Sequence, residues 1–158
     1  MTEMTPMPPA PPPPTTPIVS SGASGPRASF GLRLGAFLID WVIIVVVVII
    51  LRVILGAAGS ALGILVGLVY ASYLGGSPSG QTVGKKLVGI RIIDFNTGGP
   101  IGFGRGALRY VGQIISSIPC YLGFFWMLWD KEKQTWSDKI ATTVVVPVKD
   151  YPVEKWPG

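Results

Sequence analysis

One long stretch of this chain is almost free of charge, and that limits the folds open to it. Between residues 34 and 84 the only charged side chains are Asp40 and Arg52, and residues 110–129 carry none. Apolar runs of ~20 residues match the ~30 Å hydrocarbon core of a bilayer, because a helix rises ~1.5 Å per residue. Since 49% of the residues are hydrophobic and only 13% are charged, the sequence predicts an all-α integral membrane protein.

The residue types present exclude most enzyme chemistry. Histidine is absent and cysteine occurs once, at Cys120. Zinc sites built from Cys and His, Cys-His nucleophile pairs, Ser-His-Asp triads and internal disulfides therefore cannot form from these residues. We expect no enzymatic activity, no cofactor and no metal.

The N-terminal segment, residues 1–30, is predicted to be disordered. Residues 1–26 hold nine of the fifteen prolines and a single charge, Glu3. This composition buries too little apolar area to fold and favours polyproline II. Two interpretations stay open: a solvated tether, which we favour, and a ligand for a proline-binding partner.

Two transmembrane helices are predicted, at residues 34–55 and 58–75. The first contains a β-branched run at residues 43–50, which lipid tolerates because the backbone there has no alternative to the helix. The second carries small residues at strict four-residue spacing: Gly59, Gly63, Gly67, Ala71 and Gly75. We predict that this face packs against the first helix, with a homodimer through the same face as the alternative.

A third apolar segment, residues 107–129, permits two arrangements. It is either a kinked third span or, as we favour, a re-entrant or interfacial pair of half-helices around Pro119. Only the second arrangement keeps all three basic regions of the chain on one side, which the positive-inside rule makes cytoplasmic. We therefore predict a multi-pass protein of the plasma membrane with a cytoplasmic N-terminus. Nucleic acid is not expected as a partner, because the basic residues flank apolar segments instead of forming a stripe.

The polar connection at residues 77–106 is predicted to hold a small cytoplasmic β-hairpin. A strand at residues 87–94, a turn at 96–100 and a return at 101–103 would form it. A further strand is predicted at residues 142–148. If both strands lie on the cytoplasmic side, they can pair into a small sheet that caps the helices.

Asp40 needs a partner, because an unpaired charge inside a membrane helix costs a few kcal/mol. We predict a direct pair with Arg109 and a network closed by Asp138 and Arg33. Two roles are open for this group: a buried clamp that fixes helix register, which we favour, and a proton or ion relay. Arg52, near the far end of the first helix, is predicted to snorkel.

Three separated motifs resemble the RDD membrane-protein family. They are Arg33 with Asp40 in the first helix, GQTVGKK at residues 80–86, and WSDKIATTVVV at residues 136–146. The resemblance covers residues 31–146, the predicted membrane domain, and leaves residues 147–158 as a C-terminal tail. It implies that the Arg and two Asp of the family name correspond to Arg33, Asp40 and Asp138. The proline-rich leader is similar to that of some actinobacterial members.

The resemblance implies little about activity, since transport is proposed for some members and others look like accessory components. We expect an interaction or accessory subunit of a larger membrane complex, with a respiratory-chain assembly as one candidate. Its expected partners are the lipid bilayer and either other membrane-protein subunits or a second copy. The alternative function is an ion or proton transporter that acts as an oligomer through Asp40.

Overall fold

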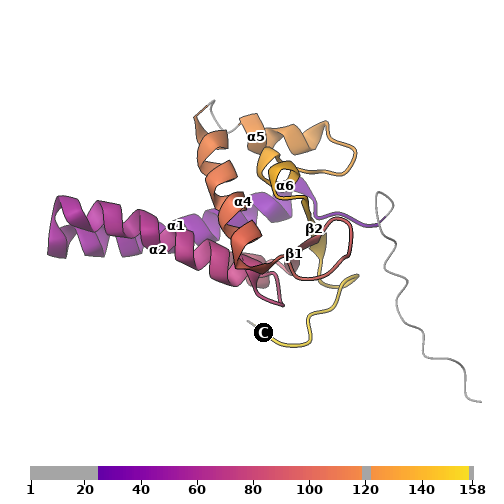
Figure 1. The fold of residues 1–158 in the computed structure, drawn as a ribbon, viewed down its shortest axis with the longest axis horizontal. Helices are drawn as coiled ribbons and strands as arrows, with labels where there is room; N and C mark the ends of the chain where they lie inside the picture. Colours follow the sequence, from indigo (N-terminus) through magenta and orange to yellow (C-terminus); the bar gives the residue numbers. More distant parts are fainter. Residues whose placement is uncertain (1–24, 119–121, 157–158) are drawn as a thin grey trace, which may run out of the picture.

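Two long helices form a hairpin that projects from a folded base (Figure 1). The computed structural model describes residues 25–118 and 122–156. Helix α1 spans Phe30–Leu55 and α2 spans Ala57–Gly76, and only Gly56 separates them. Gly56 has a φ of +61°, which glycine adopts without strain. Both helices are long and apolar enough to cross a membrane, so the described residues contain two candidate spans, or three if the bent pair formed by residues 102–117 and 122–128 counts as one.

Helix α1 begins four residues before the predicted start at residue 34. The hydroxyl of Ser29 accepts a hydrogen bond from the backbone N–H of Leu32 and so caps the first turn. This early start places Arg33 inside the first turn of the helix. The β-branched run at residues 43–50 is helical throughout.

The small-residue stripe of α2 faces two different neighbours. A Cβ atom at Gly59 would lie 2.1 Å from the carbonyl oxygen of Leu51 in α1, and one at Gly63 would lie 2.6 Å from Val48 Cγ2. A Cβ atom at Gly67 would instead lie 2.6 Å from the hydroxyl of Tyr110. The first half of the stripe therefore lets α1 approach closely, and the second half turns toward the base.

The base contains one small sheet and five short or medium helices among the described residues. The helices are α3 (Val83–Leu87), α4 (Gly102–Ser117), α5 (Leu122–Phe125), the 3-10 helix η1 (Trp126–Leu128) and α6 (Trp136–Ile140). Strand β1 (Ile90–Asp94) pairs antiparallel with β2 (Thr143–Pro147), with Ile90 opposite Pro147 and Asp94 opposite Thr143. Ile90, Ile92 and Val145 pack with Ala28 and Ala36, so the sheet is joined to the start of α1.

The predicted β-hairpin does not form. Residues 101–103 do not return as a strand, because Gly102 begins α4. The turn after β1 is held by Asp94, whose side chain accepts hydrogen bonds from the N–H groups of Asn96 and Thr97. A three-residue return strand would have offered β1 few partners, whereas β2 pairs with it over five positions. The two predicted strands do meet, as the sequence allowed.

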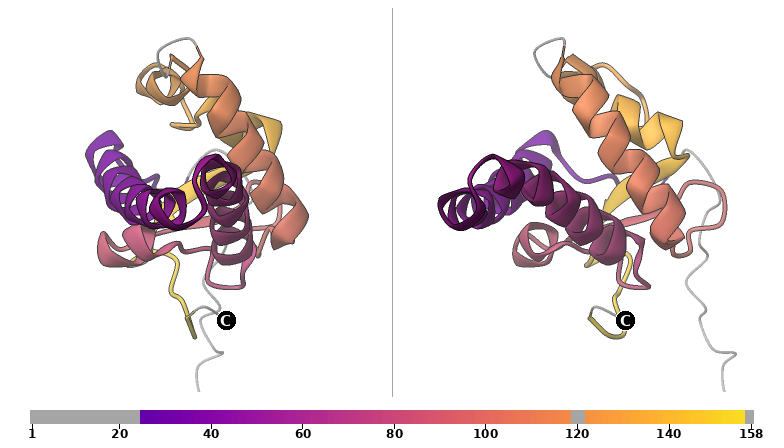
Figure 2. Two further views of the ribbon diagram at one scale, coloured as in Figure 1. Left: turned by 90° about the vertical axis from the view of Figure 1, so that its left-hand side faces the viewer. Right: turned by 60° about the vertical axis from the view of Figure 1, so that its left-hand side comes forward.

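The third apolar segment is not one straight helix. Helix α4 crosses α2 at the base of the hairpin (Figures 1 and 2), and the α5–η1 pair is bent by 112° relative to α4. The predicted break around Pro119 lies outside the described residues. The ends of α1 and α2 that meet the base lie together, so the sheet, α3 and α6 gather at one end of the hairpin.

Candidate functional site

A fully buried carboxylate joins two helices of the base to the first helix of the hairpin. Asp138 lies in the first turn of α6, where Thr135 forms a capping box with it. Arg33 of α1 and Arg109 of α4 both form ion pairs with Asp138. Arg33 also donates to the carbonyl of Lys133, and Arg109 to the hydroxyl of Thr143. The carboxylate therefore fixes α1 and α4 against α6.

The ionisation of Asp138 follows from these two cations. Burial alone would raise the pKa of Asp138, but the charges of Arg109 and Arg33 and the N–H of Thr135 hold that pKa well below its usual range. Asp138 is thus an anion at neutral pH. Two guanidinium groups share this one carboxylate, so the cluster carries a net positive charge.

Asp40 forms a second cluster, which joins α1 to α2 and α3. Its Oδ1 accepts hydrogen bonds from the hydroxyl of Tyr70 at 2.7 Å and from the N–H of Gly84 at 2.8 Å. Its Oδ2 accepts one from the hydroxyl of Thr82 at 2.5 Å and lies 3.9 Å from Lys85 Nζ. The described partners of this carboxylate therefore come from α2, from α3 and from Thr82, the N-cap of α3.

The predicted pair of Asp40 with Arg109 is wrong. Arg109 binds Asp138, and Lys85 takes the place beside Asp40. The sequence does not predict the role of Lys85, because residues 80–86 precede the predicted strand at 87–94 and no helix is expected there. The available signal was Thr82, whose hydroxyl caps the short helix α3 and thereby sets the position of Lys85.

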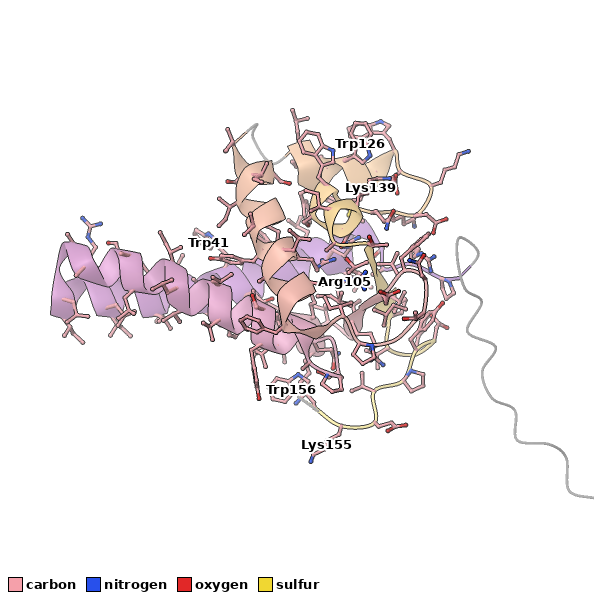
Figure 3. All side chains as sticks on the ribbon, viewed as in Figure 1. Trp41, Arg105, Trp126, Lys139, Lys155 and Trp156 are labelled. Carbon is pink, nitrogen blue, oxygen red and sulfur yellow. The ribbon has the colours of Figure 1, made fainter. Side chains whose placement is uncertain are left out.

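A cavity of about 260 Å³ lies between the two carboxylate clusters. Its walls come from α1, α2 and α4, with further residues from α3, α5 and the sheet. Its polar lining includes Arg33, Asp40, Tyr70, Lys85, Arg109 and Gln113. Trp41, which also lines the cavity, lies on the hairpin beside α4 (Figure 3). Gly67 and Ala71 of the small-residue stripe line it too, which gives the second half of the stripe a place in the site.

Removing one hydroxyl tests how strongly the Asp40 cluster holds the helices together. Tyr70→Phe is expected to lower the free energy of unfolding by ~1.5–3 kcal/mol, because a hydrogen bond to a charged group is lost. The change also deprives the N–H of Val83 of its acceptor. Tyr73→Phe is the matched control, since Tyr73 is 60% exposed on the same helix and its hydroxyl makes no hydrogen bond to a described residue. Unfolding in mild detergent would measure both, and equal losses would contradict a clamp at Asp40.

The comparisons with known proteins identify the family. The RDD family profile matches residues 27–142, well over half of the chain. The chain belongs to the RDD family. The matched range contains Arg33, Asp40 and Asp138, the residues that form the two carboxylate clusters. Among the described residues, no three His, Cys, Asp or Glu side chains gather closely enough to hold a metal ion.

Several curated proteins are similar to part of this RDD chain. The proline-rich antigen homolog of Mycobacterium tuberculosis is 42% identical over 69 residues, which are 44% of this chain and 29% of that protein. The proline-rich antigen of Mycobacterium leprae is 39% identical over 70 residues, covering 44% of this chain and 28% of that protein. The uncharacterized protein YxaI of Bacillus subtilis is 34% identical over 83 residues, or 52% of this chain and 54% of that protein.

The chain thus matches less than a third of the length of the two mycobacterial relatives. No solved structure is significantly similar to it. The predicted membership of the RDD family and the resemblance to actinobacterial members are therefore confirmed, together with the membrane character that the apolar helices give the chain.

Proposed function

We propose that this RDD protein is an accessory subunit that contacts other membrane proteins through its apolar hairpin and has no catalytic activity of its own. The observation that carries the proposal is the exposure of α1. Only 6% of its apolar stretch of 18 residues is buried inside the molecule. Val46, Ile50 and Val53 are each at least half exposed along this helix. Such a surface is covered either by lipid or by other membrane helices.

The Asp40 cluster supports a structural role over a relay. A relay carboxylate must exchange its proton with successive partners, whereas Asp40 is held by Tyr70, Thr82 and Gly84 of its own chain. Between Asp40 and the tip of the hairpin, Arg52 is the one charged residue of α1. The described part of one copy therefore contains no chain of ionisable groups along the hairpin.

The distribution of positive charge supports a cytoplasmic base. Of the thirteen basic residues of the chain, Arg52 is the one near the tip of the hairpin, and the others belong to the base or to the segments beside it. Under the positive-inside rule, the proposal places the base and both ends of the hairpin on the cytoplasmic side of the plasma membrane. In this arrangement α4 and α5 lie at the interface and do not form a third span.

Purification of the full chain from its native membrane tests the proposal. In mild detergent we expect the chain to elute with other membrane subunits at fixed stoichiometry, and native mass spectrometry would give the composition. The variant Ile50→Trp changes the exposed side of α1 and should weaken that association. The control Leu87→Trp changes an equally apolar, exposed residue of the base and should leave the association intact. Recovery of the chain alone, as a monomer or as a homo-oligomer, would contradict an accessory role.

A second function, ion or proton transport by an oligomer, is favoured by one observation. Asp40 and Lys85 both line the cavity, so the carboxylate is reachable from it. Two helices do not enclose a pathway, and transport therefore requires several copies. If the protein is a transporter, proteoliposomes that hold the purified wild-type homo-oligomer should show an ion flux, and Asp40→Asn should abolish it. The accessory role predicts no flux with the wild type or with Asp40→Asn.

A further inference from the structure

The cavity presents hydrogen-bond donors that have no acceptor within the protein. Arg109 is 5% exposed, and both of its described hydrogen bonds leave from Nη1, to Asp138 and Thr143. Its Nε and Nη2 atoms donate to none of the described residues, although the side chain lines the cavity. A buried guanidinium with unused N–H groups is a strong donor for a phosphate or carboxylate.

Two further donors line the same cavity. Lys85 Nζ donates to the hydroxyl of Thr82 at 3.1 Å and lies 3.9 Å from Asp40 Oδ2, which leaves it able to bind another acceptor. The half-buried side chain of Gln113 donates to no group in the described part of the chain. Gln113 follows Arg109 by four residues on α4, so both project from the same face of that helix.

The charges around the cavity do not balance. Three cations, Arg33, Lys85 and Arg109, are set against the two carboxylates Asp40 and Asp138, which leaves one positive charge in surplus. A surplus buried charge is costly unless an anion compensates it. The site is therefore complementary to one negative charge.

The rest of the lining is apolar and lies beside the membrane helices. Phe37, Trp41 and Ile44 of α1 contribute to it, together with Ile114 and Phe124. Trp41 is 52% exposed, as is typical of a side chain at the boundary between lipid and headgroups. A ligand with an anionic head and an apolar tail would satisfy both parts of the lining.

We propose that this cavity binds the phosphate headgroup of an anionic phospholipid. The phosphate accepts hydrogen bonds from Arg109, Lys85 and Gln113, and the acyl chains leave past Trp41 and Ile44 into the bilayer. The cavity volume of about 260 Å³ lies just below the ~300–1,000 Å³ of typical small-molecule pockets, so the proposal places the headgroup in the cavity and the acyl chains outside it.

Lipid binding to the purified full chain tests the proposal. The delipidated protein would be titrated with phosphatidylglycerol and with phosphatidylcholine in mild detergent, and bound lipid counted by native mass spectrometry. We expect one phosphatidylglycerol per chain, bound at least tenfold more tightly than phosphatidylcholine. Equal affinity for the two lipids would overturn the proposal.

Matched variants locate the lipid. Lys85→Met and Gln113→Leu should each weaken phosphatidylglycerol binding about tenfold, whereas Lys86→Met removes the same charge from an exposed neighbour and should leave binding unchanged. If Lys85→Met does not fold, Gln113→Leu decides, since its side chain bonds to no described residue. Wild-type affinity in a folded Gln113→Leu protein would overturn the site.

Soluble phosphate distinguishes the two sources of this ligand chemistry. Inorganic phosphate or glycerol phosphate at millimolar concentration should not displace phosphatidylglycerol, because neither occupies the apolar lining. Full displacement would overturn the lipid assignment in favour of a soluble phosphate compound.

The binding should also depend on pH through Lys85. Burial lowers the pKa of this side chain to about 8; Asp40 and Asp138 act to raise that pKa, while Arg109 and Arg33 lower it. Lys85 therefore loses its proton above pH 8. We expect the affinity for phosphatidylglycerol to fall between pH 7 and pH 9 in the wild type but not in Lys85→Met. A flat wild-type profile would contradict a contact between phosphate and Lys85.

Discussion

Replacing Asp138 with asparagine is expected to lower the free energy of unfolding by ~3–5 kcal/mol, because two buried guanidinium groups lose their anion. Arg33 and Arg109 are each about 6% exposed at the side chain, so water cannot replace the lost charge. The capping box with Thr135 loses one acceptor as well. Unfolding of the purified protein in mild detergent, followed by circular dichroism, would measure the loss.

Asp130→Asn is the matched control for this change. Asp130 also forms one ion pair with a basic residue, but its partner Lys139 is 44% exposed. Asp130 itself is 11% exposed and its Oδ2 accepts the N–H groups of Glu132 and Gln134, so the control should lose more than the ~0–1 kcal/mol of an exposed pair but less than Asp138→Asn. If both variants lost the same free energy of unfolding, burial of the Arg33–Asp138–Arg109 cluster would not be the cause of the loss in Asp138→Asn.

Gly106→Leu is expected to lower the free energy of unfolding by ~3 kcal/mol or more, because α2 and α4 meet there backbone against backbone. A Cβ atom at Gly106 would lie 2.7 Å from the carbonyl oxygen of Ser72 and 3.0 Å from its Cα. The backbone of α2 cannot rotate away as a side chain would, so the two helices must separate.

Gly104→Leu separates this packing effect from helix propensity. Gly104 lies in the same turn of α4, and a Cβ atom there would meet nothing within 4 Å. The control should be neutral or slightly stabilising, since leucine favours the helix over glycine by up to ~1 kcal/mol. The separation of α2 and α4 in Gly106→Leu should also weaken phosphatidylglycerol binding, because both helices line the cavity.

The membrane helices could be predicted because their signal is local. A charge-free run long enough to cross the thickness of a bilayer can be recognised without any knowledge of tertiary structure. The ion pair of Arg33 with Asp138 was also within reach, since a buried charge requires a partner and few were available. The predicted start of α1, at residue 34, lies four residues too late because the prediction does not take the Ser29 cap into account.

The remaining errors concern contacts between distant segments. Arg109 was assigned to Asp40 on depth alone, but the crossing of α4 over α2 brings Arg109 to α6. The hairpin was predicted from the turn residues at 96–100, which are a local signal. The strand that pairs with β1 is instead β2, about fifty residues further along the chain, and a local turn signal does not reveal that partner. The cavity itself exists only because three helices meet, and no sequence pattern encodes that meeting.

The single-residue turn at Gly56 has a consequence for what the protein displays. With α1 and α2 across the bilayer, their connection exposes one glycine, flanked by helix ends, on the far side of the membrane. A protease or an antibody applied from that side would find almost no chain to bind. In the proposed arrangement, nearly all of the polar surface of the described residues therefore faces a single compartment, the one that holds the base.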